Sequence, residues 1–192
     1  ITDTTNLIVL DNTGVTAVSD GAAGVGITSS NNYAIDTQRP TATIVLADSA
    51  LKVGETSQVT ITFSEAVSGF TNADLTIANG TLSAVSSADG GITWTATFTP
   101  TSNITDATNL ITLDNTGVVD LSGNAGSGTT DSANFTIDTQ RPTATIIVTD
   151  TNLAAGETSL VTITFSEAVT GFTTADLTVA NGTLSGLSSS DG

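Results

Sequence analysis

The segment Ile-Asp-Thr-Gln-Arg-Pro-Thr-Ala-Thr-Ile spans residues 35–44 and recurs unchanged at residues 137–146, an offset of 102 positions from 35 to 137. The same offset carries Ile-Thr-Phe-Ser-Glu-Ala-Val at residues 61–67 onto residues 163–169. A period of this length is the size of one small domain. The chain is therefore built from repeated domains, and the fold of one repeat decides the fold of the others.

The boundaries of the repeats follow from the Gln-Arg-Pro segment, which we take as the linker between domains. We expect residues 38–139, called here the central repeat, to form a complete domain. Residues 1–37, the N-terminal segment, are then the C-terminal part of a preceding repeat, and residues 140–192, the C-terminal segment, are the N-terminal part of a following one. Each outer part alone would expose unpaired strand edges. We therefore expect either a longer continuous array or head-to-tail association with a second copy.

The composition limits the fold and the partners. Hydrophobic residues make up 38% of the chain and aromatic residues 4%, which predicts a thin, aliphatic core. With 19 acidic and three basic residues, the net charge is −16, so nucleic acids and anionic membrane surfaces are disfavoured and cations are favoured. The absence of cysteine excludes disulfides and thiolate metal sites. No apolar run approaches the ~18–20 residues of a membrane-spanning helix, so we expect no direct membrane insertion of this segment.

Thr, Val, Ile and Phe alternate with a period of two through the central repeat, and Gly, Asn, Asp and Pro interrupt the alternation. This pattern predicts short antiparallel strands with one buried face. Seven such strands in about 100 residues are typical of an immunoglobulin-like β-sandwich. We therefore predict an all-β fold of tandem sandwiches. The expected strands are residues 41–47, 57–64, 73–78, 81–86, 92–98, 108–113 and 132–137.

The same alternation predicts the core and one turn. The expected core residues of the central repeat are Val59, Ile61, Phe63, Ile92, Trp94, Ala96 and Phe98, and Tyr33 takes a core position in the N-terminal segment. Asn79-Gly80, repeated as Asn181-Gly182, predicts a two-residue type I′ hairpin, because that turn needs positive φ at both central positions. Pro40 and Pro142 should start the first strand of their repeats in an extended, partly stiff linker.

Several short motifs together resemble a known family. They are Phe-Ser-Glu-Ala-Val at residues 63–67, Ala-Asp-Leu-Thr at 73–76, Asn-Gly-Thr-Leu at 79–82, Asp-Leu-Ser-Gly-Asn at 120–124 and the linker segment at 35–41. This ordered set resembles the bacterial Ig-like repeats of giant surface adhesins, including biofilm-associated and RTX-type adhesins. The resemblance covers essentially the whole chain. It implies a secreted, cell-surface array of similar domains that projects a ligand-binding tip, often with calcium between the domains.

The acidic residues fall mainly in loops, and strand parity predicts which loops share a pole. In a seven-strand sandwich, the second, fourth and sixth strands run back toward the end where the domain begins. The linker acid and the loop acids of that pole should gather there. This first set comprises Asp36, Glu65, Asp74, Asp89, Asp114 and Asp120, with Asp138, Glu167, Asp176 and Asp191 as counterparts in the next copy. The opposite pole carries Asp48, Glu55 and Asp106 and should face that next copy.

Stacked domains would bring both acidic sets to each junction, where uncompensated carboxylates repel. A calcium ion, which takes 6–8 oxygen ligands, would neutralise them and fix the interdomain angle. The alternative for each residue is a turn in which Asp bonds its own backbone. That alternative fits the tetrapeptides Asp-Asn-Thr-Gly at residues 11–14 and 114–117 better, because the full EF-hand and RTX spacings are absent. In the first copy, residues 17–21 replace Asp120 to Asn124 with Ala-Val-Ser-Asp-Gly, so a site there is altered or missing.

Two classes of function remain for such a chain. We expect no enzyme, because the sequence lacks His and Cys and shows no nucleophile elbow or phosphate-binding glycine loop. The leading hypothesis is a structural extender of a bacterial cell-surface adhesin, stiffened by calcium and supporting adhesion or biofilm formation, whose partners are neighbouring repeats of the array. The alternative is a glycan- or protein-binding Ig-like module, which an exposed Trp94 beside polar groups would favour.

Overall fold

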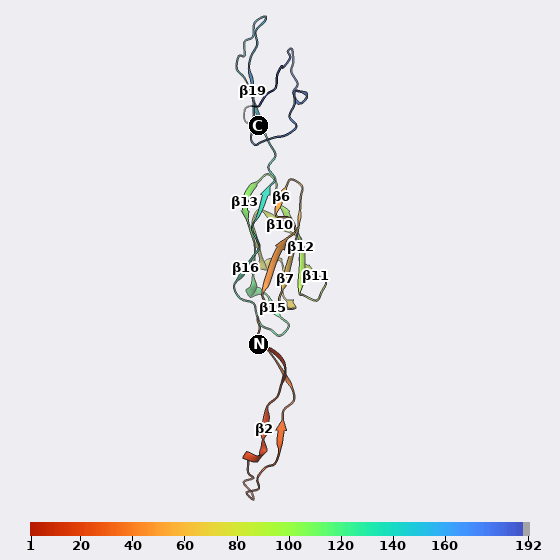
Figure 1. The fold of residues 1–192 in the computed structure, drawn as a ribbon, viewed down its shortest axis with the longest axis vertical. Coiled ribbons are helices and arrows are strands. Elements are labelled where there is room, and N and C mark those ends of the chain that lie inside the picture. Colours follow the sequence, from red (N-terminus) through yellow and green to blue (C-terminus); the bar gives the residue numbers. More distant parts are fainter. Residues whose placement is uncertain (190–192) are drawn as a thin grey trace. The chain divides into compact units, whose positions relative to one another are not determined.

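The computed structural model describes residues 1–189 of the chain as strands joined by loops and single 3-10 turns (Figure 1). The chain divides into two compact units, residues 1–139 and the part that begins at Gln140. We describe each unit by itself. Within the described residues, no helix is long and apolar enough to cross a membrane.

One face of the central repeat is a sheet whose strands follow the order β10-β12-β7-β5, with the short β11 also on β12. The strands are β5 (Ala42–Leu46), β7 (Ser57–Phe63), β10 (Gly80–Leu82), β11 (Ser86–Ser87) and β12 (Thr93–Pro100). All pairings are antiparallel, and Ile61 lies opposite both Ile44 and Trp94. Every second residue of β7 is buried, which confirms the alternation in its sequence.

The other face consists of shorter strands in three groups. The first group has the order β13 (Thr105–Asn109), β17 (Phe135–Asp138) and β6 (Ala50–Lys52). The second has β16 (Thr129–Asp131), β14 (Ile111–Asp114) and β9 (Leu75–Ile77), and the third pairs β15 (Val119–Asp120) with β8 (Val67–Ser68). β17 and β6 are parallel to each other. Short 3-10 turns, η2 (Asn72–Asp74) and η3 (Asn115–Gly117), precede β9 and follow β14.

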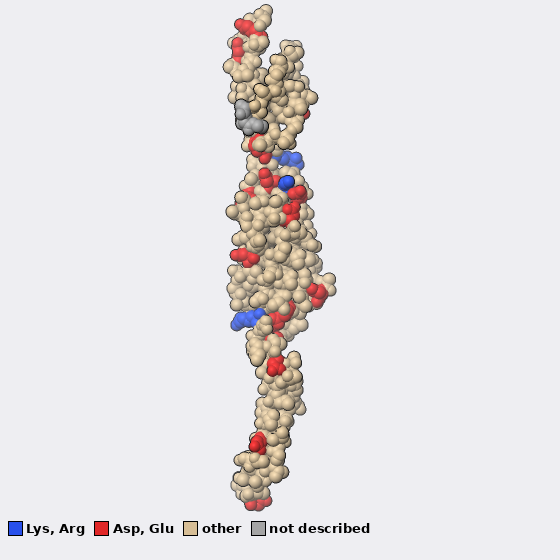
Figure 2. Space-filling view, in the orientation of Figure 1, with Lys and Arg blue, Asp and Glu red and all other residues tan. Residues whose placement is uncertain are grey.

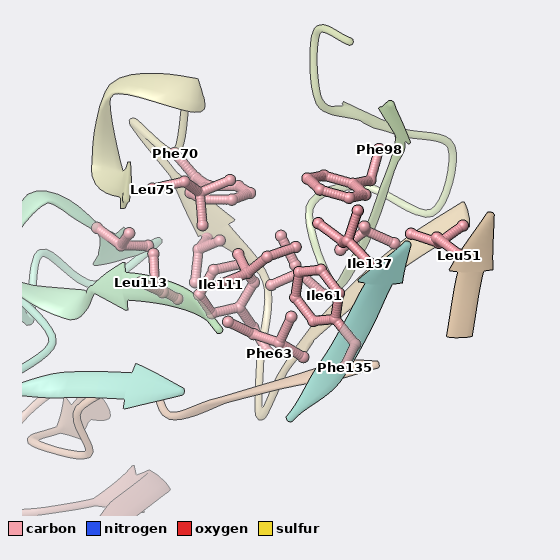
Figure 3. Close-up of a cluster of buried hydrophobic side chains, with 14 residues drawn as sticks. Leu51, Ile61, Phe63, Phe70, Leu75, Phe98, Ile111, Leu113, Phe135 and Ile137 are labelled. Carbon is pink, nitrogen blue, oxygen red and sulfur yellow. The ribbon is translucent and has the colours of Figure 1, made fainter. Parts of the chain in front are cut away.

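The core of the central repeat lies between these two faces (Figure 3). Phe98 of β12 is fully buried and meets Phe135 of β17 edge to face, with ring centroids 5.2 Å apart. A second aromatic chain links Phe63 to Phe70 and Phe70 to Trp94, each at 5.3 Å. Aliphatic side chains fill the space between the two groups. The prediction of an all-β, immunoglobulin-like sandwich is confirmed.

The strand predictions were close for the long strands and incomplete for the short ones. β6, β8, β15 and β16 lie outside every predicted strand, and the predicted strands 81–86 and 108–113 are each replaced by two strands. The sixth strand breaks because the β13–β17 register shifts between Asp106 and Asn109. Asn109 is buried at this irregularity, and its side-chain amide donates to the carbonyls of Asp106 (3.1 Å) and Phe135 (3.2 Å). A polar side chain therefore replaces ladder bonds at the break.

The predicted hairpin at Asn79-Gly80 is wrong. Asn79 has a φ of 56°, but Gly80 does not have positive φ, and β9 and β10 pair with different partners in different sheets. Asn79 therefore turns the chain from one sheet to the other. Gly80 is needed for another reason, because a Cβ there would clash with the ring of Phe98. Asn181 repeats the positive φ, at 58°.

Two predicted core residues are also wrong. Ile92 lies outside β12, which begins at Thr93, and is 40% exposed. Tyr33 is 43% exposed, whereas Phe135 at the same place in the central repeat is 1% exposed. The difference arises because Phe135 packs against Phe98 of a facing sheet, and the described N-terminal segment has no facing sheet. Trp94 is half-buried, while the other five predicted core residues of the central repeat are buried as expected.

The outer segments repeat parts of this architecture. In the N-terminal segment, β1 (Thr2–Asn6) pairs with β4 (Tyr33–Asp36), and β2 (Val9–Asp11) pairs with β3 (Ile27–Ser29). β1 and β4 have the same register, with the same irregularity, as β13 and β17. In the C-terminal segment, β18 (Ala144–Val148) pairs with β19 (Val161–Phe165) as β5 pairs with β7. The 3-10 turns η1 (Asn12–Gly14) and η4 (Thr174–Asp176) match η3 and η2.

Candidate metal centre

Three acidic residues from separate parts of the chain meet where the linker enters the central repeat. Asp36 ends β4, Glu65 follows β7, and Asp120 ends β15. One carboxylate oxygen from each lies within 4.8 Å of the others. Strand parity predicted that these three would share a pole, and the structure brings them together. Among residues 1–189, this is the one group of three acidic side chains found at such a distance.

Asp120 is the buried member, with 2% of its surface exposed. Its Oδ1 accepts hydrogen bonds from the backbone N–H groups of Ser122 and Asn124, both at 2.8 Å, and its Oδ2 accepts from the Asn124 side-chain amide at 2.8 Å. Burial raises the pKa of Asp120, but the bonds from Asn124 and Ser122 outweigh burial and the pKa is lowered overall. The loop 120–124 therefore folds around an ionised carboxylate.

The Asp36 carboxylate accepts hydrogen bonds from the N-terminal segment and from the central repeat. Its Oδ1 accepts from the Thr2 hydroxyl at 2.9 Å and from the Gln38 backbone N–H at 3.1 Å. Its Oδ2 accepts from the Ser122 hydroxyl at 3.0 Å, across 86 residues of sequence. The bond from Gln38 is the main reason that the pKa of Asp36 is lowered, with further contributions from Thr2 and Ser122. Asp36 is therefore a second ionised group in the cluster.

Glu65 differs from the other two because one of its buried carboxylate oxygens receives no hydrogen bond. Its Oε1 is buried and has no hydrogen-bond partner. Burial, and then the nearby charges of Asp120 and Asp36, raise the pKa of Glu65. A buried carboxylate oxygen without a donor is unusual in a folded protein. Two ionised carboxylates and one carboxylate oxygen without a donor form an arrangement that fits a hard cation. The cation would balance the negative charge of the three side chains.

The other predicted acids of this pole are each bonded within their own loop. Asp74 forms a capping box with Thr71 at the start of η2, and Asp114 accepts from the backbone and hydroxyl of Thr116 at 2.9 and 2.7 Å. Asp11 repeats the latter contact with Thr13, which confirms an Asx turn for both Asp-Asn-Thr-Gly segments. These carboxylates serve turns and do not join the cluster.

Asp89 is also bonded within its loop, and it gives a pH prediction. Its carboxylate accepts from the backbone N–H of Thr93, the hydroxyl of Ser87 and the backbone N–H of Ile92. The bonds from Thr93 are the main cause that lowers the pKa of Asp89 to about 2. We expect an NMR titration of its side-chain carboxyl carbon to give a midpoint near that value. Because the folded-state pKa is lowered, the stabilisation is present above the unfolded value and is lost as pH falls toward 2. A midpoint near 3.9, the ordinary value for Asp, would contradict the loop geometry.

The acids of the opposite pole make the same kind of local contact. Asp48 accepts from the backbone of Ala50 at 2.9 Å, and Glu55 accepts from the backbone of Lys52 at 2.8 Å. Asp106 accepts from the backbone of Thr108 and from the amide of Asn79, both at 2.8 Å. On the face shown in Figure 2, the acidic side chains of the central repeat lie mostly toward its two ends, with few between them.

Asp138 is the counterpart of Asp36 at the following linker, and its surroundings repeat. It accepts from the hydroxyl of Thr105 at 2.9 Å, as Asp36 does from Thr2. In the C-terminal segment, Glu167 is exposed and Asp176 forms a capping box with Thr173. Asp191 lies outside the described residues. Metal binding by any of these residues stays a prediction.

The polar residues that surround the three acids were not among the residues predicted from the sequence. Ser122 and Asn124 both contact Asp36, and Arg39 donates from its guanidinium to the backbone carbonyl of Ala125 at 2.8 Å. The motif Asp-Leu-Ser-Gly-Asn at residues 120–124 contains both Ser122 and Asn124, but only its aspartate was predicted as a site residue. A short loop of this composition provides a carboxylate, a hydroxyl and an amide within five residues.

Comparison with known proteins places the chain in a family. Residues 36–137 and 138–192 each match the bacterial Ig-like domain, and the chain belongs to this family, which is a non-catalytic fold family. No curated protein and no solved structure matches the chain. The division of the chain at Gln38 and Gln140 stays a prediction.

Proposed function

We propose that the chain is a structural extender of a bacterial cell-surface adhesin, secreted and non-enzymatic, in which calcium stiffens the joints between repeats. The buried, unpartnered Oε1 of Glu65 carries the calcium part of this proposal. The membership in the bacterial Ig-like family and the tandem repeat support the extender role. A role in adhesion or biofilm formation follows from the resemblance of the motifs.

The donor set favours calcium over other metals. All three candidate side chains are carboxylates, and the sequence contains no His or Cys to supply nitrogen or sulfur ligands. Hard oxygen ligands in a flexible arrangement are typical of calcium. The bound ion would supply positive charge and oxygen coordination at the joint, and the three carboxylates would hold it.

The placement of the three acids explains why binding would stiffen a joint. Asp36 belongs to the segment before the linker, whereas Glu65 and Asp120 belong to the central repeat. A ligand shared by both sides ties the end of one repeat to the start of the next. In the sequence, Asp138 and Glu167 are the counterparts of Asp36 and Glu65 one repeat later.

Glu65→Gln tests the proposal directly. The change removes a charge without breaking a hydrogen bond at Oε1, so in chelator the thermal midpoint should equal or exceed that of the wild type. In calcium at about 100 times its dissociation constant, the wild type should gain about 2.7 kcal/mol by mass action, and the variant much less. Calorimetry should show one fewer bound ion. Unfolding is followed through Trp94, the one tryptophan of the chain.

Glu55→Gln is the matched control, because Glu55 lies outside the cluster and bonds the backbone of Lys52. It should keep the full calcium response. If wild type and Glu65→Gln responded to calcium equally, Glu65 would not be a ligand. If the wild type bound no calcium at all, the stiffening role would be refuted.

A glycan-binding module is less well supported. Sugar-binding sites often expose an aromatic face. The ring of Trp94 packs edge to face on Phe70, and its indole N–H donates to the carbonyl of Gly91 at 3.1 Å. Its polar group is thus already used within the fold.

A further inference from the structure

The loop 120–125 contacts the linker directly, with protein groups alone. The Ser122 hydroxyl donates to the carboxylate of Asp36 at 3.0 Å, and the Asn124 amide donates to the backbone carbonyl of Asp36 at 3.1 Å. The Arg39 guanidinium donates to the carbonyl of Ala125 at 2.8 Å. These three hydrogen bonds span 86 to 88 residues of sequence. They fasten the linker to the central repeat at its entry.

Asn124 is the side chain that joins the two halves of this contact. The same amide nitrogen donates to the backbone of Asp36 and to Oδ2 of Asp120 at 2.8 Å. One NH₂ group has two hydrogens, so both bonds can form at once. The acceptors are a linker carbonyl and a buried loop carboxylate, and their separation is therefore set by one planar group.

We propose that Asn124 is the positioning residue of this joint: its amide clasps the linker at Asp36 to the loop at Asp120, whether or not a metal is bound. The inference rests on the same cluster as the proposed function, but its main consequence does not require calcium. Removing the amide should loosen the linker in chelator. It should also weaken calcium binding, because groups that orient ligands typically contribute 10–100-fold in metal affinity.

The chain contains a natural comparison in its first copy. Ala17 donates its backbone N–H to the carbonyl of Ala22 at 2.8 Å, as Asp120 donates to the carbonyl of Asn124 at 3.1 Å. Ala17 and Ala22 therefore stand where the central repeat has its carboxylate and its amide. That loop keeps the backbone turn but lacks both clasping groups. Of the two copies of this loop in the chain, only the one in the central repeat has the clasp.

The test uses the whole chain with nitroxide labels on two introduced cysteines, Ser29→Cys in β3 and Thr99→Cys in β12. Both positions are exposed, and the chain has no other cysteine. Pulsed electron paramagnetic resonance then measures the distribution of distances between the two labels. One label is on the N-terminal segment and the other is on the central repeat. In chelator, Asn124→Ala and the equal-sized Asn124→Asp should both broaden this distribution relative to the unsubstituted chain.

Leu121→Ala is the matched control, because Leu121 belongs to the same loop and is 77% exposed. It should leave the distribution unchanged. The bonds that the backbone N–H and carbonyl of Asn124 make with Asp120 do not involve the amide, so the loop should keep its turn in every variant. The thermal midpoint through Trp94 should fall for both Asn124 variants, and it should fall further for Asn124→Asp, which places a second carboxylate beside the buried Asp120. Temperatures well below the lowest midpoint keep the distance measurements on folded protein. In calorimetry, Asn124→Ala should bind calcium at least tenfold more weakly than Leu121→Ala.

The two proposals fail in different ways. If the unsubstituted chain bound no calcium, the metal proposal would fall while the measurements in chelator would still decide the clasp. If both Asn124 variants kept a distribution as narrow as the unsubstituted chain in chelator, Asn124 would not position the joint.

Discussion

Phe98→Ala is expected to lower the free energy of unfolding of the central repeat by about 3–5 kcal/mol. The Phe98 side chain is fully buried, and its ring centroid lies 5.2 Å from that of Phe135. It also lies against Gly80, whose lack of a Cβ leaves room for the ring. Shrinking it leaves a cavity between the two faces that rigid strands cannot fill. Urea unfolding followed by Trp94 fluorescence measures the loss, since Trp94 belongs to the same repeat.

The control is Val45→Ala, on β5 of the same sheet, where the side chain is 60% exposed. This change should alter the stability by less than about 1 kcal/mol, because little apolar area is lost. A loss for Phe98→Ala as small as that of the control would show that the interface between the two faces is not closed around Phe98.

Asn109→Ala is expected to destabilise the central repeat by about 2–4 kcal/mol, because buried polar groups that lose a partner cost about 1–3 kcal/mol each. The Asn109 amide donates to the carbonyls of Asp106 and Phe135, and its Oδ1 accepts from the amide of Asn79 at 2.9 Å. Alanine leaves all three groups without these bonds at a site that is 1% exposed. The same urea unfolding experiment applies.

Gln58→Ala is the control for loss of an amide, since Gln58 is exposed on β7. It should change the stability by no more than about 0.5 kcal/mol. Asn109→Asp keeps the size but places a charge beside the carboxylate of Asp106, and it should destabilise at least as much as alanine. Stability unchanged in Asn109→Ala would mean that water satisfies these groups.

The long strands could be predicted because their alternation extends over several residues. β7 buries Val59, Ile61 and Phe63 in strict alternation, and the sequence states this pattern directly. β6 has three residues and one buried side chain, Leu51, so no period is visible. The broken sixth strand could not be predicted either, because Asn109 is polar and its burial depends on partners 26 and 30 residues away.

The candidate site was predicted in outline, because strand parity decides which loops share a pole. Strand parity could not distinguish an acidic side chain that is hydrogen-bonded within its own turn from one whose carboxylate oxygen has no donor. For Asp74 and Asp176 the sequence did hold that information, since Thr-x-x-Asp before a strand has the form of a capping box. For Glu65 it did not, because the absence of a donor around Oε1 is a property of the packed structure.

We expect the parallel pair β6 and β17 to resist stretching of the central repeat. β6 follows β5, the first strand of the central repeat, and β17 is the last strand and ends where the chain leaves the repeat. Thr136, Ile137 and Asp138 lie opposite Ala50, Leu51 and Lys52. Tension applied along the chain draws these neighbours in opposite directions along their own length. The ladder is therefore loaded in shear, with its hydrogen bonds strained together, whereas strands pulled apart from one end would unzip bond by bond.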